Sequence, residues 1–232
     1  MSPQSIADQL SPFLEYLANH HNSGTEFLPS LSEINKETGR SVSILREELE
    51  VAKALGLAEV KPRVGIKCLP YSFTPAVAKS LAYAVTTNKD MFRQFSDLRN
   101  HIETSYWYQA VSSLADDDIE TLKNIVQRAQ QKLQSAPIQI PHPEHSLLHL
   151  TIYSRLDNIF VQGILEAYWY IYEAIGLNVY EDQKYLERVW VFHQQMVDSI
   201  VEGDYLSGYQ ALIAHMDLLF QREQKNVNVL FE

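Results

Sequence analysis

Residues 28–68 read LPSLSEINKETGRSVSILREELEVAKALGLAEVKPRVGIKC, and this stretch decides the fold. Ser30 and Glu33 have the S-x-x-E spacing of a capping box, in which each satisfies a free amide at a helix start. Gly39 stands where this short helix must end, because glycine adopts the left-handed conformation without a steric penalty. Ser41 then caps a second helix.

The second helix is followed by a predicted hairpin. Its apolar positions recur at helical spacing, and Gly56 closes it. Residues 57–61 and 66–68 are typical of strands, and the Pro/Gly segment 62–65 between them has the length of a tight turn. Two short helices followed by two strands predict a winged helix-turn-helix.

Length and composition place few other limits on the chain. Its 232 residues suffice for one large domain or two modest ones, and 46% apolar with 21% charged residues is ordinary for a globular protein. No apolar run approaches the ~20 residues that span a bilayer, and no signal pattern opens the sequence. The single cysteine, Cys68, fits a reducing cytoplasm, where we expect the protein to reside.

The net charge of −10 is unusual for a protein that binds nucleic acid. Residues 1–75 contribute only −2 of it, from seven Lys/Arg against nine Asp/Glu, and the remainder contributes −8. Contact with phosphate depends on local charge. The basic residues of the predicted helix-turn-helix and wing are Arg40, Arg46, Lys61, Arg63 and Lys67.

The remaining sequence predicts helices and one domain boundary. An amphipathic helix at 5–20 would support the winged domain, which we assign to residues 1–72. An extended linker at about 69–77 carries two prolines, and an all-helical domain follows over 78–232. The expected helices there are 76–87, 90–113, 117–135, 144–156, 158–176, 182–202 and 205–224. The predicted fold is therefore mainly α, a winged helix-turn-helix followed by an antiparallel helical bundle.

Aromatic residues are frequent in this second domain, at 106–108 and at 168–172. They indicate either packing in the core and a dimer interface, or a ligand cavity lined by rings.

The order LPS..E(I)...(T)G.S...LRE.L......GL......GI resembles the DNA-binding signature of the GntR family of bacterial transcription regulators. The second half resembles the helical FCD effector domain of its FadR-type subgroup. The cues there are Leu98-Arg99, Glu103, His145, His149, Asn158, His193, Gly203-Asp204 and His215. The two resemblances together span about residues 5–224. They imply double-stranded operator DNA, a small-molecule effector and a homodimer, with no membrane partner.

Two departures from the family pattern concern arginines that commonly touch DNA. Leu31-Ser32 stands where the family has Glu-Arg, and Ser41-Val42 where it has Ser-Arg. The operator sequence therefore does not carry over.

Within the winged domain, the resemblance implies a set of DNA-binding residues. The recognition helix enters the major groove with its first turns. Ser43 and Arg46, three residues apart, share a face of this helix, and Arg46 would meet a phosphate or a guanine edge. The other candidates are Ser30, Arg40, Arg63, Gly65 and Lys67. The alternative is that Arg46 only pairs with nearby glutamates.

Four histidines form a candidate metal site. His145 and His149 lie one helical turn apart, and the Gly203-Asp204 break brings the helices of His193 and His215 side by side. His145 replaces the aspartate that is the usual first ligand of the family, and Glu144 or His142 are alternative replacements. Imidazole ligands favour zinc or nickel over magnesium or calcium. Packing without a metal is the alternative for all four.

The same replacement affects the expected effector. Four imidazoles leave a divalent ion with a charge of about +2, whereas a set with one carboxylate leaves about +1. We therefore expect a small carboxylate effector, with Arg99 as a second anchor. Some members of the subgroup bind an acyl ligand without metal, so a metal-free version stays open.

Three functions remain in comparison. The first is a dimeric, ligand-responsive transcription regulator on a palindromic operator, which is not an enzyme. The second is a helical metalloenzyme in which the histidines activate water, although no general base is evident on a matching turn. The third is a protein-interaction module with structural histidines.

Overall fold

The computed structural model describes residues 9–175 and 183–229, with side chains as far as Leu218. The chain divides into two compact units between Lys79 and Ser80, here called the winged unit and the helical unit, and each is described by itself. Among the described residues, every helix is too short or too polar to traverse a lipid bilayer.

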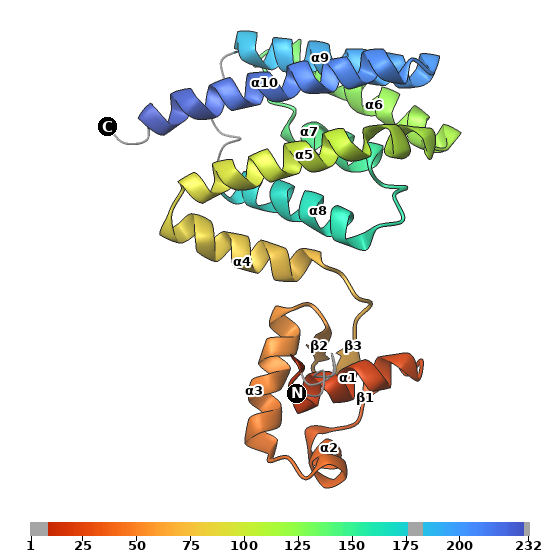
Figure 1. The fold of residues 1–232 in the computed structure, drawn as a ribbon, viewed down its shortest axis with the longest axis vertical. Coiled ribbons are helices and arrows are strands. Elements are labelled where there is room, and N and C mark those ends of the chain that lie inside the picture. Colours follow the sequence, from red (N-terminus) through yellow and green to blue (C-terminus); the bar gives the residue numbers. More distant parts are fainter. Residues whose placement is uncertain (1–8, 176–182, 230–232) are drawn as a thin grey trace, which may run out of the picture. The chain divides into compact units, whose positions relative to one another are not determined.

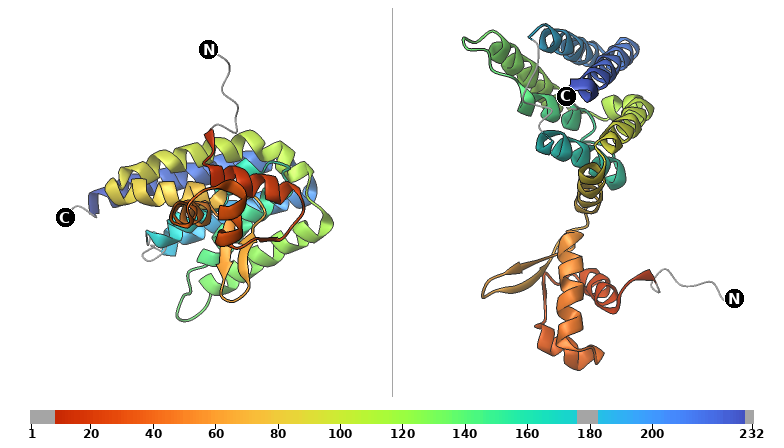
Figure 2. Two further views of the ribbon diagram at one scale, coloured as in Figure 1. Left: turned by 90° about the horizontal axis from the view of Figure 1, so that it is seen from below. Right: turned by 90° about the vertical axis from the view of Figure 1, so that its left-hand side faces the viewer.

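In the described part of the winged unit, three helices and a small sheet precede α4 (Thr74–Thr87) (Figure 1). Its elements are α1 (Pro12–Asn22), β1 (Phe27–Leu28), α2 (Leu31–Thr38), α3 (Val42–Ala54), β2 (Ala58–Lys61) and β3 (Gly65–Cys68). The strands are antiparallel in the order β1-β3-β2. In the right-hand view of Figure 2, the β2–β3 hairpin projects to one side of α3. This arrangement confirms the predicted winged helix-turn-helix.

Local capping explains where α2 and α3 begin and end. Ser30 Oγ accepts from the Glu33 amide at 3.3 Å, and Glu33 Oε2 accepts from the Ser30 amide at 2.8 Å, which completes the predicted capping box. Gly39 ends α2 with φ of 70°. The Ser41 hydroxyl accepts from the Ile44 amide at the start of α3.

The structure corrects two boundaries around this unit and adds one short strand. The helix predicted over 5–20 begins only at Pro12, because Ser11 caps it, and residues 5–8 lie outside the described residues. The short strand β1 was not predicted, since two residues are too few to show alternation. Helix α4 (Thr74–Thr87) begins inside the predicted linker, because Pro75 in its first turn loses no hydrogen bond.

The helical unit confirms the predicted all-helical architecture. It continues with α5 (Asp90–Ser112), α6 (Asp116–Leu133), α7 (His142–Ile152), α8 (Ile159–Ala174), α9 (Gln183–Glu202) and α10 (Tyr205–Val229). Helices α9 and α10 lie side by side, α6 packs on α9 and α7, and α5 packs on α10 and α8 (Figure 1). Helix α7 ends four residues earlier than predicted, with Tyr153 as its C-terminal cap.

The main core of the helical unit surrounds the middle of α7. Trp107, Leu122, Ile125, Leu148 and Ile152 are each 0% exposed. Buried polar side chains lie in the same unit, on α5, α7, α9 and α10. Since buried polar groups need partners, these side chains locate the candidate site.

Candidate metal centre and DNA interface

Four histidines from three helices meet inside the helical unit. His145 and His149 lie on α7, His193 on α9 and His215 on α10. One ring nitrogen from each histidine lies within 4.8 Å of those of the other three. His145 is 8% exposed and the other three are 0% exposed. The structure therefore brings together all four predicted ligands.

The four imidazoles are held in the neutral form. Burial lowers the pKa of His145, His193 and His215 well below 6.5, and the neighbouring histidine rings and Arg99 lower it further. Burial also lowers the pKa of His149, although Glu103 opposes this shift. A neutral imidazole keeps the lone pair that metal ligation requires.

The ring nitrogens of this cluster fit a divalent metal ion. In the described part of the chain, Nε2 of His145 and both ring nitrogens of His215 have no hydrogen-bond partner. Each buried polar atom without a partner costs about 1–3 kcal/mol. The Nε2 atoms of His149 and His193 are 3.3 Å apart. Two nitrogens on a tetrahedral ion lie about 3.4 Å apart when each bond is about 2.1 Å long.

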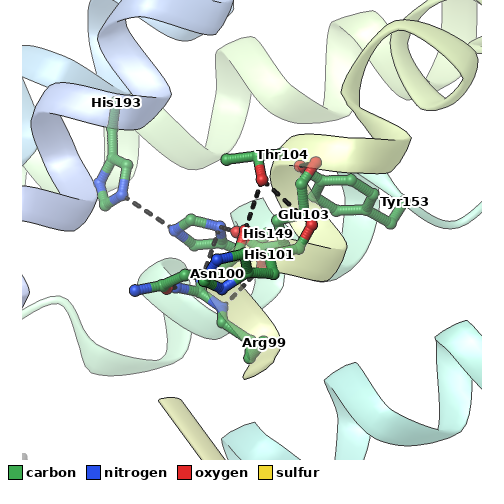
Figure 3. A network of polar contacts seen from close by, with 8 residues as sticks. All are labelled: Arg99, Asn100, His101, Glu103, Thr104, His149, Tyr153 and His193. Atoms are coloured by element: carbon green, nitrogen blue, oxygen red, sulfur yellow. Dashed lines mark hydrogen bonds and ion pairs between the residues drawn. The ribbon is translucent and has the colours of Figure 1, made fainter. Parts of the chain in front are cut away.

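Helix α5 supplies a buried ion pair next to His149 (Figure 3). Arg99 Nε lies 2.8 Å from Glu103 Oε1, and both side chains are 0% exposed. Glu103 Oε2 lies 3.1 Å from Nδ1 of His149. Burial alone would raise the pKa of the Glu103 carboxyl, but Arg99 and His149 outweigh it and hold this pKa below its usual range. The sequence marked Glu103 only as a family cue, because its contact with His149 crosses 46 residues.

Arg99, the predicted effector anchor, already has several partners. Besides Glu103, its guanidinium lies 3.1 Å from Asn100 Oδ1 and 3.0 Å from Nδ1 of His149. The guanidinium carbon also lies 4.9 Å from the centre of the Tyr168 ring. Arg99 therefore lies beside the cluster, and its guanidinium could contact an anion only by giving up one of these partners.

Aromatic rings and a narrow cavity surround His145. Its ring centre lies 4.7 Å from that of Trp169 and 6.4 Å from that of Trp190. A cavity of about 10 Å³ beside it is lined by Ile140, Pro141, His142, Tyr185, Leu186 and Val189 as well. This volume suits about one water molecule. The aromatic residues thus pack the site, and an effector larger than water requires the cavity to widen.

The two alternative replacements for the family's aspartate differ in position from His145. The carboxylate of Glu144 accepts from Lys132 Nζ at 2.8 Å, and His142 lines the outer cavity. Only His145 joins the other three histidines in the cluster of described residues.

The exposed face of α3 carries the predicted DNA contacts. Ser43 and Arg46 are exposed, whereas Leu45 and Leu49 are buried, so the two polar residues share the outer face. Ser30, the N-cap of α2, is exposed, and so is Arg40, which lies between Gly39 at the end of α2 and Ser41 at the start of α3.

Arg46 does not form the ion pair considered as its alternative role, as far as the described side chains extend. The neighbouring carboxylate of Glu48 accepts instead from the backbone amide of Phe13 at 2.7 Å. Glu50 pairs with Lys53 at 2.7 Å. Because these acidic groups are engaged elsewhere, the Arg46 guanidinium is available to solvent.

The wing places one arginine in a strained conformation. The Val64 amide donates to the Lys61 carbonyl at 3.1 Å, so Pro62 and Arg63 are the central residues of a tight turn. Arg63 has φ of 66°, a value that is common for glycine but rare for residues with a side chain, apart from asparagine and aspartate. Gly65 follows with φ of 128° and continues the turn into β3. The Arg63 side chain is exposed at the tip.

Lys67, another predicted DNA contact, has an acidic partner. Its ammonium lies 2.7 Å from Glu26 Oε1, and this carboxylate raises the pKa of Lys67. Lys61 lies 3.2 Å from Glu59 Oε1. The local positive charge of the wing is therefore concentrated on Arg63.

Comparison with known proteins shows which family this chain resembles. The FCD domain family matches residues 94–218, slightly more than half of the chain, and this range holds all four histidines, Arg99 and Glu103. The solved structure of Streptococcus agalactiae GntR superposes with a TM-score of 0.62 at 15% identity, covering 93% of this chain and 97% of that one.

A second solved structure is that of Lar, described as controlling the expression of the Listeria monocytogenes agr system and mediating virulence. It has a TM-score of 0.52 at 14% identity and covers 97% of this chain and 99% of that one. At such identities the likeness concerns the fold. No curated protein matches the sequence.

Proposed function

This chain belongs to the GntR family of transcription regulators and carries its FCD domain, and from this premise we propose that it binds operator DNA under the control of a metal-dependent helical unit. The observation that carries the DNA-binding role is the exposed outer face of α3, where Arg46 lacks an acidic partner among the described side chains. Helix α3 is the recognition helix and enters the major groove with Ser43 and Arg46.

The protein acts as a homodimer on a palindromic operator. One winged unit offers few basic groups, because Lys61 and Lys67 are paired with Glu59 and Glu26. A single copy therefore binds weakly. Two copies joined through their helical units read two half-sites, and linking raises their effective concentration on DNA.

Replacement of Arg46 by alanine should weaken operator binding about tenfold or more, since a lost base or phosphate contact costs roughly 1–3 kcal/mol. The measurement is fluorescence anisotropy with an operator fragment at constant salt. Lys53→Ala is the matched control, because Lys53 lies at the far end of the same helix and pairs with Glu50. Equal affinity of Arg46→Ala and the wild type would remove α3 from the interface.

Arg63→Gly should weaken DNA binding without lowering the stability of the wing. Glycine adopts the φ of 66° found here without the penalty of about 1–2 kcal/mol that a side chain incurs. We therefore expect amide exchange in β2 and β3 to slow or stay unchanged. Operator affinity should fall at the same time, and its salt slope should decrease by about one per lost phosphate contact. A variant that binds as tightly as the wild type would show that the wing does not contact DNA.

The metal ion is held by His145, His149, His193 and His215, and zinc or nickel is the expected identity. Support comes from the neutral, buried imidazoles and from ring nitrogens without other partners in the described residues. When bound, the ion supplies a positive centre for an anionic ligand. Arg99 lies beside it, and a small carboxylate metabolite is the effector class that suits both charges.

A hydrolytic role for the same cluster has less support. Catalytic zinc sites keep one coordination position for water, with three protein ligands. Four imidazole nitrogens within 4.8 Å of one another suffice to surround a tetrahedral ion. The cluster therefore favours a structural or ligand-sensing metal.

Selection of bound fragments from genomic DNA tests the proposed function as a whole. We expect one enriched palindrome, whose neighbouring genes would indicate the metabolite. The same fragments should be retained less by Arg46→Ala and equally by Lys53→Ala. Recovery of no common sequence at moderate salt would contradict the proposal.

A further inference from the structure

Nδ1 of His149 lies within hydrogen-bonding distance of two buried groups (Figure 3). Arg99 Nη2 is 3.0 Å away and Glu103 Oε2 is 3.1 Å away. A guanidinium only donates and a carboxylate only accepts. The single nitrogen therefore satisfies one of the two partners at a time, according to whether it carries a proton.

The two choices correspond to the two neutral tautomers of His149. With the proton on Nε2, Nδ1 accepts from Arg99, and the Nε2 proton points toward His193 Nε2 at 3.3 Å. With the proton on Nδ1, the ring donates to Glu103 and Nε2 has a free lone pair. The net charge of the ring is zero in both, so the exchange releases no proton.

A metal ion selects between these tautomers. Nε2 is the nitrogen that faces His193, so it is the atom through which His149 ligates. A protonated nitrogen cannot ligate. Metal binding therefore requires the Nδ1 proton, and Glu103 is its acceptor, in the way that carboxylates commonly orient metal-bound histidines.

The same exchange removes a partner from Arg99. Once Nδ1 carries a proton, the Arg99 Nη2 group loses its acceptor on His149 while Nε stays 2.8 Å from Glu103. The side chain is 0% exposed, so water does not freely replace the lost acceptor. The buried Arg99 Nη2–H group then lacks an acceptor, and an anionic oxygen would supply one.

We propose that metal binding switches His149 from the tautomer that accepts from Arg99 to the one that donates to Glu103, and that the Arg99 N–H group released in this way binds the carboxylate of the effector. This inference rests on the proposed metal site. It makes Glu103 the positioning residue of His149. It also makes the effector's affinity depend on the metal through the protein as well as through the charge of the ion.

The tautomer of His149 is measured by ¹⁵N NMR of the histidine rings in the full-length wild-type protein. The resonance is assigned by its loss in His149→Gln. Titration of chelator-treated protein with Zn²⁺ should move the proton of His149 to Nδ1. In Glu103→Gln, whose side chain keeps an acceptor oxygen, the switch should persist. In Arg99→Gln/Glu103→Leu, which buries no unpaired charge, Nδ1 loses both of its present partners. Metal-free His149 should then lose its preference for the Nε2 tautomer, and Zn²⁺ should bind more weakly than to the wild type.

Arg99 is tested with acetate as the probe anion and calorimetry as the readout. Acetate should bind the zinc-loaded wild type about tenfold more tightly than zinc-loaded Arg99→Gln, a ratio that corresponds to one charge-assisted hydrogen bond. Arg155→Gln is the matched control, since Arg155 pairs with the exposed carboxylate of Asp118 at 2.8 Å. Zinc content and far-ultraviolet circular dichroism are recorded for each variant.

The outcomes separate this inference from the metal site itself. Absence of bound zinc would overturn the proposed metal function and this inference with it. Stoichiometric zinc with the His149 proton still on Nε2 would overturn the switch alone. Equal acetate affinity of zinc-loaded wild type and Arg99→Gln would overturn the role of Arg99, whether or not the tautomer changes.

Discussion

Addition of Zn²⁺ to the chelator-treated protein is expected to raise the unfolding midpoint of the helical unit by about 5–10 °C at a free metal concentration about 100 times Kd. The reason is that the four histidines form a site only when the helices α7, α9 and α10 are folded together. Tryptophan fluorescence reports this unit alone, since Trp107, Trp169 and Trp190 all lie in it. Metal analysis should give one ion per chain.

His215→Leu distinguishes a metal ligand from a packing residue. Both ring nitrogens of His215 lack hydrogen-bond partners among the described residues, so leucine removes two unsatisfied atoms. After chelator treatment, we expect the variant to be at least as stable as the wild type. The response to Zn²⁺ should be lost.

The control for His215→Leu is His101→Ala. The His101 side chain is 73% exposed on α5 and lies outside the cluster. It should leave the zinc response unchanged. If chelator-treated His215→Leu is much less stable than the chelator-treated wild type, His215 has a packing role. If the zinc response of the variant is unchanged, His215 is not a ligand.

Acidification of the chelator-treated protein should destabilise the helical unit at pH values well above those at which carboxylates titrate. Burial lowers the pKa of His145, His193 and His215 well below the 6.5 expected in the unfolded chain. Below that pH the unfolded state therefore binds protons that the folded state does not. Each such histidine lowers the free energy of unfolding by up to about 1.4 kcal/mol per pH unit, so the loss between about pH 7.5 and 5.5 is several kcal/mol.

The measurement is urea unfolding followed by tryptophan fluorescence across this pH range. His145→Gln removes one titrating ring and should make the pH slope shallower by about one histidine's share. A free energy of unfolding that stays constant between about pH 7.5 and 5.5 would show that the histidines do not stay neutral in the folded chain.

Much of the winged unit was predictable because its signals are local. The capping box of Ser30 with Glu33 and the cap at Ser41 act over three residues, and Gly39 acts on its own backbone. The start of α1 was misplaced because the apolar spacing continued through Ser11-Pro12, where the capping signal should have taken precedence.

The four histidines were predictable only with the family resemblance. Spacing places His145 and His149 on one face of a helix, and the break at Gly203 brings two helices together. Spacing does not say that the two pairs face each other. The contacts of Glu103 and Arg99 with His149 were harder to predict, because 46 positions separate Glu103 from His149 and 50 separate Arg99 from it.

Local signals in the sequence were therefore enough for most of the helices, for the caps at Ser30, Gly39 and Ser41 and for the wing turn, since hydrogen bonds and side-chain periodicity over a few residues decide these features. Only the tertiary structure decided that Arg46 and Arg63 lack acidic partners among the described side chains while Lys67 has one in Glu26. It also decided that one nitrogen of His149 serves both Arg99 and Glu103. These contacts depend on packing between helices and strands distant in sequence, and no local pattern encodes them.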